Sequence, residues 1–408
     1  MFSPNATGVG ADAGEPWIAR TPLALRLNVA HHAAWGINHA VRCRKSNTMT
    51  PLPIDAWRIL DAAANRAGEG LRVIEEFARF GLNDAHLSRL LKECRHELTA
   101  ALTAIPEANR LAARDTLGDV GTAIGTPSEY QRATLPDVAR ASFKRVQEAL
   151  RTLEEYGKLI ESNGVGPTFA QRVEQLRYRL YTAEKAVLRT VSAVDRLQGQ
   201  RLYLLVTAQS CASGLEATVR GALAAGVRIF QVREKQLPDR RLVEHARRLR
   251  EWTAESGALL IVNDRPDIAV LADADGVHVG QDELTVRDAR QIVGPDRLVG
   301  VSTHSIEQAR QAVLDGADYL GVGPTFRSGT KSFDQFAGLE FVRQVAAEIA
   351  LPWFAIGGID TANLNSVLAA GASRVAVGGA ICGAADPHQA ASDLLQRLST
   401  HPASSRRE

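Results

Sequence analysis

Eight short β-rich runs alternate with helical stretches over the second half of the chain, and this alternation constrains the fold more than any other feature. The runs cover 201–207, 227–232, 258–263, 275–279, 298–301, 318–323, 352–356 and 373–378. Eight strands with intervening helices over about 200 residues favour a closed (β/α)8 TIM barrel over a doubly wound open sheet. In such a barrel the chemistry lies where the strands end, so the residues after each run are the candidate site residues.

The segment before the barrel, about 55–195, has helical periodicity. Its apolar residues step by three and four in stripes such as Leu60, Ala64, Ala67, Leu71, Ile74 and Ala78, or Val173, Leu176, Leu180, Ala183 and Val187. Asn83 or Asp84 is expected to cap a helix, and Pro136-Asp137 to open another. The sequence therefore predicts an all-α helical domain over 51–197, a barrel over 198–400, and a short tail over 401–408.

The first fifty residues lack clear periodicity, and we interpret 1–50 as a disordered tail. Four arginines with few acids after Glu15 leave a targeting segment as an alternative. The only methionines are Met1 and Met49, and the periodic sequence begins just after Met49. The sequence does not decide between these two as the true start.

Two of the predicted helices resemble each other. Residues 65–80 align without gaps on 144–159, and the shared residues are mostly charged: Arg66/Arg145, Glu69/Glu148, Leu71/Leu150, Arg72/Arg151, Glu75/Glu154 and Glu76/Glu155. One interpretation is a duplicated hairpin with ion pairs on helix surfaces. The other is a paired Arg/Glu site for a phosphate and its metal, joined by loop residues between 114 and 121.

Composition excludes several classes of function. The 48 basic and 46 acidic residues give 48 − 46 = +2, so no global field attracts nucleic acid or an anionic membrane. The four cysteines are scattered without a CxxC pair, which is typical of reduced thiols in a cytosolic protein. No apolar run reaches the roughly 18 residues of a membrane span. We expect a cytoplasmic protein without nucleic-acid or membrane partners, and homo-oligomerisation stays open.

The strand ends combine cations with carboxylates. The second run leads into Arg233-Glu234-Lys235, which suits an anionic group because guanidinium and ammonium groups donate to phosphate oxygens. The third ends at Asn263-Asp264, and the fourth leads into Asp282-Glu283. Carboxylates from adjacent strand ends can hold Mg²⁺ against a diphosphate. The sequence therefore predicts a magnesium-assisted anion site near strands two to four.

A second anionic site is predicted near the last strands. Glycine pairs follow strands seven and eight, at 357–358 and 378–379, where backbone N–H groups can approach a phosphate. The sixth strand runs into a loop of small donors closed by Lys331. We assign no catalytic role to His278 or His304, because a histidine near a strand end is often only a satisfied polar residue.

The run from 201 to about 397 resembles the thiamine-phosphate synthase family throughout, with QVREK, VNDRPDIA, ADGVHVGQDEL, GVSTHS, DYLGVGPTF, SGTKS and AIGGI in order. The resemblance implies a Mg²⁺-dependent transferase of thiamine biosynthesis. It would join 4-amino-2-methyl-5-hydroxymethylpyrimidine diphosphate to 4-methyl-5-(2-phosphooxyethyl)thiazole, releasing thiamine phosphate and pyrophosphate. The segment 55–195 resembles a domain fused ahead of some members.

The resemblance also implies residue roles. Arg233, Lys235 and Lys331 would be catalytic. The pyrimidine diphosphate would be held by Gln231, Val232, Arg233, Glu234, Lys235, Asn263, Ser302 and Lys331. The thiazole phosphate would be held by Ser328, Gly329, Thr330, Gly358, Gly378 and Gly379. The metal ligands would be Asp264 and Glu283, with Asp282 as a substitute.

This sequence departs from the family pattern at two places. The family usually has Asp where this chain has Glu283, so Asp282 is kept as an alternative ligand. The family often has an apolar residue and Ser where this chain has Gly378-Gly379, which removes a hydroxyl donor. Three alternatives remain: a thiazole tautomerase, a non-catalytic phosphate sensor, and a bifunctional enzyme whose helical domain phosphorylates the pyrimidine monophosphate. Against the last, no P-loop or Gly-rich kinase signature is present.

Overall fold

The computed structural model describes residues 52–125, 131–160, 168–327 and 336–400. The chain divides into two units, Met1–Thr48 and Met49–Glu408, and all described residues belong to the second. The tails predicted over 1–50 and 401–408 lie outside the described residues and stay predictions. None of the described helices combines the length and apolar character that a membrane span requires.

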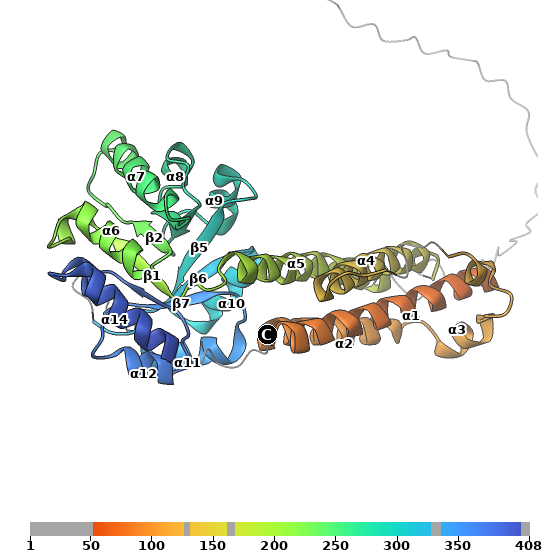
Figure 1. Cartoon of the computed structure of the whole chain (residues 1–408). Helices are drawn as coiled ribbons and strands as arrows, with labels where there is room; N and C mark the ends of the chain where they lie inside the picture. The colour runs from red at the N-terminus through yellow and green to blue at the C-terminus, as the bar shows by residue number, and fades with distance from the viewer. Residues whose placement is uncertain (1–51, 126–130, 161–167, 328–335, 401–408) are drawn as a thin grey trace, which may run out of the picture. The chain divides into compact units, whose positions relative to one another are not determined.

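The first half of the second unit is helical, as predicted. Its elements are α1 (Ile54–Glu76), η1 (Phe77–Gly81), α2 (Ala85–Leu102), α3 (Glu107–Ala113), η2 (Val120–Ala123), α4 (Leu135–Ile160) and α5 (Thr168–Arg196). The long helices α1, α2, α4 and α5 run alongside one another (Figure 1). The predicted apolar stripes form their buried core. Asp84 is the N-cap of α2, because its Oδ1 accepts a hydrogen bond from the Leu87 N–H at 2.7 Å.

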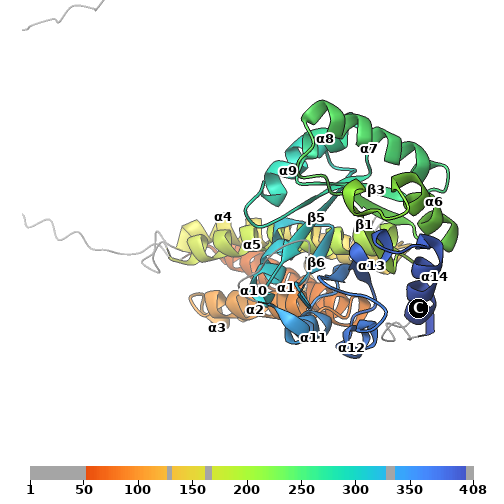
Figure 2. The same cartoon turned by 90° about the vertical axis from the view of Figure 1, so that its left-hand side faces the viewer.

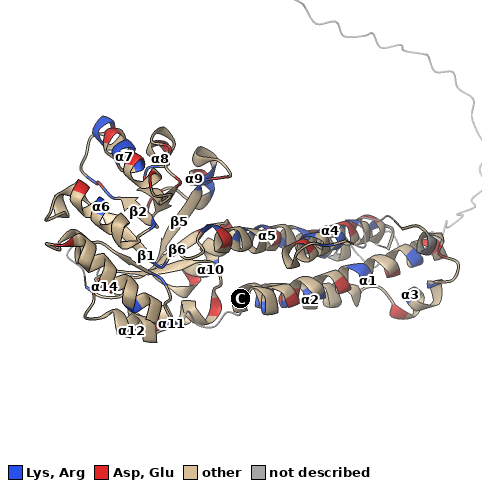
Figure 3. Cartoon of the chain, viewed as in Figure 1, with Lys and Arg blue, Asp and Glu red and all other residues tan. Residues whose placement is uncertain are grey.

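Most of the charges repeated between α1 and α4 form ion pairs. Arg72 pairs with Glu75 and Glu76, and the equivalent Arg151 pairs with Glu154 and Glu155. Blue and red segments are interspersed along the long helices, so neither sign dominates them (Figure 3). The ion-pair interpretation therefore accounts for this part of the repeat.

The second half is the predicted (β/α)8 barrel. Its eight parallel strands pair in chain order, and β1 pairs β8 to close the sheet. The strands are β1 (Leu202–Val206), β2 (Ile229–Val232), β3 (Leu259–Asn263), β4 (Gly276–Val279), β5 (Leu298–Thr303), β6 (Tyr319–Val322), β7 (Trp353–Ile356) and β8 (Val375–Val377). The predicted fold class is confirmed. The boundary predicted between 197 and 198 stays a prediction, although α5 ends just before β1 begins.

Helices surround the strands and connect each to the next (Figure 2). They are α6 (Leu215–Ala225), α7 (Asp239–Ala254), α8 (Pro266–Leu271), α9 (Val286–Val293), α10 (Ile306–Asp315), α11 (Gly338–Glu348), α12 (Leu364–Ala369), α13 (Gly379–Cys382) and α14 (Pro387–Thr400), with a short turn, η5 (Ala208–Ser210), after β1. Because the connections return each strand in the same direction, all the carboxyl ends of the strands meet at one rim.

The barrel interior is filled by alternate residues of the strands. One buried layer contains Leu197, Tyr203, Ile229, Ile261, Leu298, Tyr319, Phe354 and Ala376. Its two tyrosine rings need space, and Gly300 on β5 provides it: a Cβ at Gly300 would collide with the Tyr319 ring. Since side chains alternate along a strand, the next inward positions on β2 to β5 lie nearer the carboxyl rim. These positions carry Gln231, Asn263, His278 and Ser302.

Candidate active site

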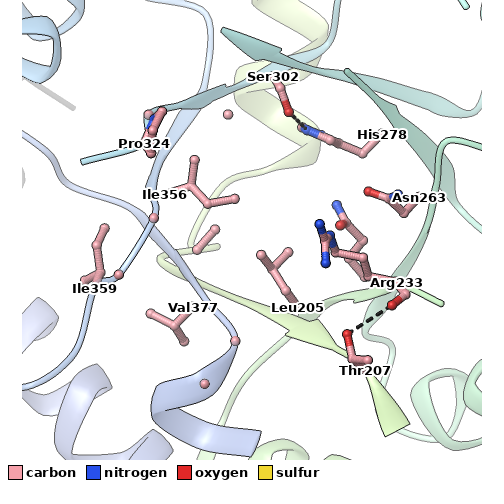
Figure 4. A pocket seen from close by; sticks show the side chains of 18 of the residues that line it. Leu205, Thr207, Arg233, Asn263, His278, Ser302, Pro324, Ile356, Ile359 and Val377 are labelled. Carbon is pink, nitrogen blue, oxygen red and sulfur yellow. Dashed lines mark hydrogen bonds between the residues drawn. The ribbon is translucent and has the colours of Figure 1, made fainter. Parts of the chain in front are cut away.

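A cavity of about 500 Å³ opens at the carboxyl ends of the strands. Its polar lining comes from Gln231, Arg233, Lys235, Asn263, Asp264, His278, Glu283, Ser302 and His304, and its other side from Pro324, Arg327, Ile356, Gly357, Gly358, Ile359, Val377, Gly378, Gly379 and Cys382, among others. In Figure 4, Arg233, Asn263, His278 and Ser302 face Ile356, Ile359 and Val377 across this space. A ligand seated there would thus contact a polar wall on one side and an apolar, glycine-rich wall on the other.

The ends of β2 and β3 meet as the sequence predicted. The ammonium of Lys235 lies 3.5 Å from a carboxylate oxygen of Asp264, and Asn263 donates from Nδ2 to the same oxygen at 2.6 Å. Asp264 has a backbone φ of 61°, a conformation that favours Asp and Asn among residues with a side chain. Its local backbone therefore turns directly after β3 and keeps the carboxylate at the rim.

Two carboxylates line this part of the cavity, Asp264 and Glu283. The Glu283 carboxylate folds back over Gly280, where a Cβ would collide with it. Among the described residues no group of three or more His, Cys, Asp or Glu side chains could enclose a metal. A pair of carboxylate donors still fits Mg²⁺, because this ion commonly takes one or two carboxylates and completes its shell with substrate phosphates and water.

Three of the predicted site residues do not line the described cavity, and their roles stay predictions. Asp282 is exposed and does not line the cavity, whereas Glu283 does, so the longer carboxylate reaches the site. The Val232 side chain is buried in the packing outside the interior layer, because adjacent strand residues point to opposite sides. The Glu234 carboxylate accepts a hydrogen bond from the Ala208 N–H at 2.6 Å and does not line the cavity.

The opposite wall depends on glycine. Gly357 and Gly358 follow β7 with φ values of 104° and 62°, and a Cβ at Gly358 would collide with the carbonyl oxygen of Arg327. Only glycine fits there without strain. At Gly379 a Cβ would meet nothing within 4 Å, so its backbone is open to the cavity. The remaining predicted phosphate contacts, Ser328, Gly329 and Thr330, and the predicted catalytic Lys331 lie outside the described residues.

A chain of hydrogen bonds lies under the polar wall, and sequence reasoning missed two of its members. Gln231 donates from Nε2 to the Tyr203 hydroxyl at 2.7 Å, and that hydroxyl lies 3.0 Å from the Tyr319 hydroxyl. The Tyr319 hydroxyl lies 3.2 Å from His278 Nδ1, and His278 Nε2 lies 2.9 Å from Ser302 Oγ. Tyr203 lies in none of the quoted motifs, and Tyr319 lies in DYLGVGPTF without a role assigned to it, although each occupies an inward position of its strand.

The titratable side chains of this hydrogen-bond chain keep their neutral forms. Burial, with a contribution from the nearby Arg233 guanidinium, lowers the pKa of His278 to about 4. Burial also raises the pKa of both tyrosine hydroxyls above the ordinary value. His278 is therefore a neutral imidazole with hydrogen bonds at both nitrogens, which agrees with its interpretation as a satisfied polar residue.

A second cavity, of about 680 Å³, lies between α1 and α4. It is lined by Ala63, Arg66, Glu69, Gly70, Val73, Ser142, Arg145, Glu148, Ala149 and Thr152. Two of the repeated pairs, Arg66/Arg145 and Glu69/Glu148, therefore face the same space from equivalent positions. Within the described ranges these four side chains form no ion pair, unlike the other repeated charges. Loop residues Arg114 and Asp115 do not line this cavity.

A closed parallel barrel with a mixed cationic and acidic cavity at its carboxyl rim defines the class: a (β/α)8-barrel enzyme for small anionic substrates. Residues 202–381 match the family model described as thiamine monophosphate synthase, and residues 58–186 match the ThiD2 family. The chain belongs to the thiamine-phosphate synthase family, and it is a transferase. The expectation of this family and of thiamine phosphate synthesis is confirmed.

The relatives match over both halves of the chain. A thiamine-phosphate synthase of Rhodopirellula baltica is 45% identical over 354 residues, covering 85% of this chain and 93% of the relative. One of Gloeobacter violaceus is 46% identical, covering 84% and 96%. Among solved structures, a thiamine phosphate pyrophosphorylase from Pyrococcus furiosus is 34% identical, covering 50% of this chain and 97% of that chain, with a TM-score of 0.46.

Proposed function

We propose that the barrel cavity transfers the pyrimidine methylene of 4-amino-2-methyl-5-hydroxymethylpyrimidine diphosphate to the nitrogen of 4-methyl-5-(2-phosphooxyethyl)thiazole. The bond between the methylene carbon and the diphosphate oxygen breaks, and a bond between that carbon and the thiazole nitrogen forms. The products are thiamine phosphate and pyrophosphate. The observation that carries the proposal is the meeting of Lys235, Asp264 and Glu283 at one wall of the cavity, opposite the glycines after β7 and β8.

The polar wall is proposed to hold the diphosphate. Arg233 and Lys235 both line the cavity, and their cations stabilise the charge that grows on the leaving pyrophosphate. Because the aminopyrimidine ring can delocalise positive charge at its methylene, no protein nucleophile is needed. Lys331 is proposed to join this group from the loop after β6. Catalysis then consists of positioning and electrostatic stabilisation.

The proposed metal is Mg²⁺, held by Asp264 and Glu283. When bound, it neutralises part of the diphosphate charge and so makes pyrophosphate a better leaving group. Asp264 also lies 3.5 Å from the Lys235 ammonium, so this carboxylate would hold the metal beside a cation of the protein. Without a metal, the two carboxylates would repel the diphosphate, and this repulsion supports the proposal of a bound Mg²⁺.

The glycine-rich wall is proposed to receive the thiazole phosphate. The backbones of Gly358, Gly378 and Gly379 line the cavity without side chains, so their N–H groups can approach phosphate oxygens. Ser328, Gly329 and Thr330 are proposed to add donors from the loop after β6. The apolar Ile356 and Val377 lie beside these glycines and suit the body of a thiazole ring.

The decisive assay mixes the purified full-length chain with both substrates and Mg²⁺ and measures thiamine phosphate and pyrophosphate. We expect the two products in equal amounts. A chain that binds both substrates but forms neither product would overturn the proposed transfer. Conversion of one thiazole tautomer to another without joining would instead favour the tautomerase.

Adjacent acids provide a matched test of the metal site. In Glu283→Gln we expect the Mg²⁺ concentration for half-maximal activity to rise by roughly 10- to 100-fold, because one of two charged ligands is lost. In Asp282→Asn we expect no change, since that side chain is exposed outside the cavity. The reverse result, with Asp282 sensitive and Glu283 tolerant, would assign the second ligand to Asp282.

A second candidate activity is carried by the cavity between α1 and α4. We propose that its Arg66/Arg145 and Glu69/Glu148 pairs bind a phosphorylated pyrimidine and metal-bound ATP, with transfer of the γ-phosphoryl group to the pyrimidine monophosphate. The four side chains are available because none forms an ion pair within the described ranges. The full-length chain, given ATP and the monophosphate without thiazole phosphate, should release ADP and pyrimidine diphosphate. Activity that is absent, or unaffected by Arg66→Gln with Arg145→Gln, would leave the helical half as a scaffold.

A cytoplasmic location and homo-oligomer formation also stay proposals. The location is consistent with a biosynthetic enzyme of this family, and cell fractionation tests it. Light scattering of the purified chain measures the oligomeric state directly.

A further inference from the structure

The orientation of the Gln231 amide sets the direction of the hydrogen-bond chain beneath the cavity. Gln231 donates to the Tyr203 oxygen, so the single proton of Tyr203 is free to go to Tyr319. Tyr319 then donates to His278 Nδ1, and the proton of the neutral imidazole sits on Nε2 and goes to Ser302 Oγ. In this direction every proton has an acceptor, and every member of the chain is satisfied.

With Gln231 Nε2 facing the Tyr203 hydroxyl, the opposite direction fails at Tyr203. If Ser302 donated to His278 Nε2, then Nδ1 would donate to Tyr319 and Tyr319 to Tyr203. The Tyr203 oxygen would accept twice, and its own proton would have no acceptor among the described residues. A fully buried hydroxyl without an acceptor is costly, so the direction from Gln231 to Ser302 is strongly favoured.

Gln231 and Ser302, the two ends of the hydrogen-bond chain, line the substrate cavity. The direction of the hydrogen bonds therefore decides whether each of them presents a donor or an acceptor to a ligand. Ser302 Oγ already accepts from His278, which leaves its own O–H to donate into the cavity. Gln231 uses its Nε2 group on Tyr203, which leaves its Oε1 as an acceptor. The Gln281 side chain helps to hold Ser302 in place, because its Nε2 donates to the Ser302 backbone carbonyl at 2.6 Å. The cavity thus presents a fixed donor and a fixed acceptor.

We propose that Tyr203, Tyr319 and His278 are positioning residues that select the 4-amino form of the pyrimidine by fixing the donor and acceptor roles of Ser302 and Gln231. This inference rests on the proposed function of the cavity. A 4-aminopyrimidine offers a ring nitrogen acceptor beside amino donors, which matches the pair. A 4-oxo analogue offers an N–H donor beside a carbonyl acceptor, the inverse pattern. A site with fixed roles leaves that analogue's polar groups unpaired and rejects it.

Glycines on the barrel strands leave room for the side chains of this hydrogen-bond chain. A Cβ at Gly300 would collide with the Tyr319 ring, and a Cβ at Gly321 would lie 3.2 Å from the His278 ring. Phe354 packs against both tyrosine rings at 5.1 and 5.8 Å between centroids and holds their planes. The hydroxyls are therefore placed by rigid packing, which is what a positioning role requires.

The test measures binding of the pyrimidine diphosphate and of its 4-oxo analogue by calorimetry on the full-length chain, with Mg²⁺ and without thiazole phosphate. In Tyr319→Phe the imidazole loses the donor that fixes its tautomer, so Ser302 can point its proton either way. We expect preference for the amino form to fall about tenfold, while the KM for thiazole phosphate changes less than twofold. Tyr203→Phe should weaken the preference through Gln231.

Two controls separate this role from packing. Phe354→Leu loosens the same layer without removing a hydroxyl, so its loss of preference should be smaller than the loss in Tyr319→Phe. In a Ser302→Ala background, Tyr319→Phe should alter the preference less than twofold, because the end of the chain is already gone. An unchanged preference in Tyr319→Phe, or an equal loss in Phe354→Leu, would overturn the proposal.

A measurement on the unaltered chain keeps the proposal testable if a variant does not fold. Nitrogen-15 NMR distinguishes the two imidazole tautomers, and we expect His278 to carry its proton on Nε2. A proton on Nδ1 would refute the proposed direction of the hydrogen bonds from Gln231 to Ser302. This result is independent of turnover, so absence of thiamine phosphate synthesis and failure of the positioning role are distinguishable.

Discussion

Burial of His278 as a neutral imidazole makes the stability of the barrel depend on pH. The side chain is 5% exposed, and burial lowers its pKa to about 4 from 6.5. Below pH 6.5 the unfolded chain therefore binds a proton at this residue that the folded chain does not bind. The sign follows from linkage: the stability contributed by this group is fully present above pH 6.5 and is lost as pH falls from 6.5 toward 4.

The magnitude follows from the same two values. At pH 5 the unfolded imidazole is protonated and the folded one remains neutral, so the cost is about 1.36 × (6.5 − 5), or about 2 kcal/mol. Other buried histidines with lowered pKa values, such as His86, add to the total loss in the unaltered chain. The contribution of His278 is isolated by replacing it.

We therefore compare urea unfolding at pH 7 and pH 5 for the unaltered chain and for His278→Gln, without substrates or Mg²⁺. Glutamine can still hydrogen-bond in the layer but does not titrate. The variant is expected to be less stable at pH 7, and its loss of stability between the two pH values should be smaller by about 2 kcal/mol. His388→Gln, at an exposed position of α14, is the control. Its loss of stability between pH 7 and pH 5 should equal that of the unaltered chain. An equal pH-dependent loss in His278→Gln and the unaltered chain would refute the reasoning.

Two further predictions concern the helical half, each with a neighbouring control. Gly68→Ala should raise the free energy of unfolding by up to about 1 kcal/mol, because a Cβ there meets nothing within 4 Å and alanine favours helix. Gly70→Ala should lower it by about 1–2 kcal/mol, since its Cβ would lie 2.5 Å from a methyl of Val146 where α1 meets α4; equal effects in thermal unfolding would contradict this packing. Glu154→Gln should cost about 2 kcal/mol, because this buried carboxylate pairs with a buried arginine of α5, while Glu155→Gln, at an exposed site, should change stability by less than about 0.5 kcal/mol. Similar losses in both variants, measured by urea unfolding, would show that burial does not determine how much these ion pairs contribute to the free energy of unfolding.

The meeting of the proposed catalytic groups was predictable because strand ends in a parallel barrel share one rim. Arg233, Lys235 and Asp264 lie about thirty residues apart or less along the chain, yet the alternation of strands and helices alone placed them together. Local sequence does not decide which of Asp282 and Glu283 lines the cavity, because the two acids are adjacent. Only the loop conformation shows which of them turns over Gly280 into the cavity.

The repeat between α1 and α4 shows a similar division. The alignment identified the shared charges but left their role open between ion pairs and a ligand site. The structure separates them by position: Arg72 and Glu75 pair along the helix, whereas Arg66 and Glu69 face a cavity with their equivalents. Helical spacing indicates which residues share a face of a helix. It does not indicate whether the opposing helix packs against that face or leaves a cavity there.

The sequence by itself determined the barrel, the helical segment and the rim that carries the candidate site, because these follow from periodicity and from local strand-end chemistry. Tertiary structure alone decided the hydrogen-bond chain through Tyr203, Tyr319 and His278. Its members come from five different strands, and their contact depends on the register and closure of the sheet, on glycines that make space for two rings, and on the exclusion of water. None of these is a property of any short stretch of sequence, so they appear only when the barrel closes.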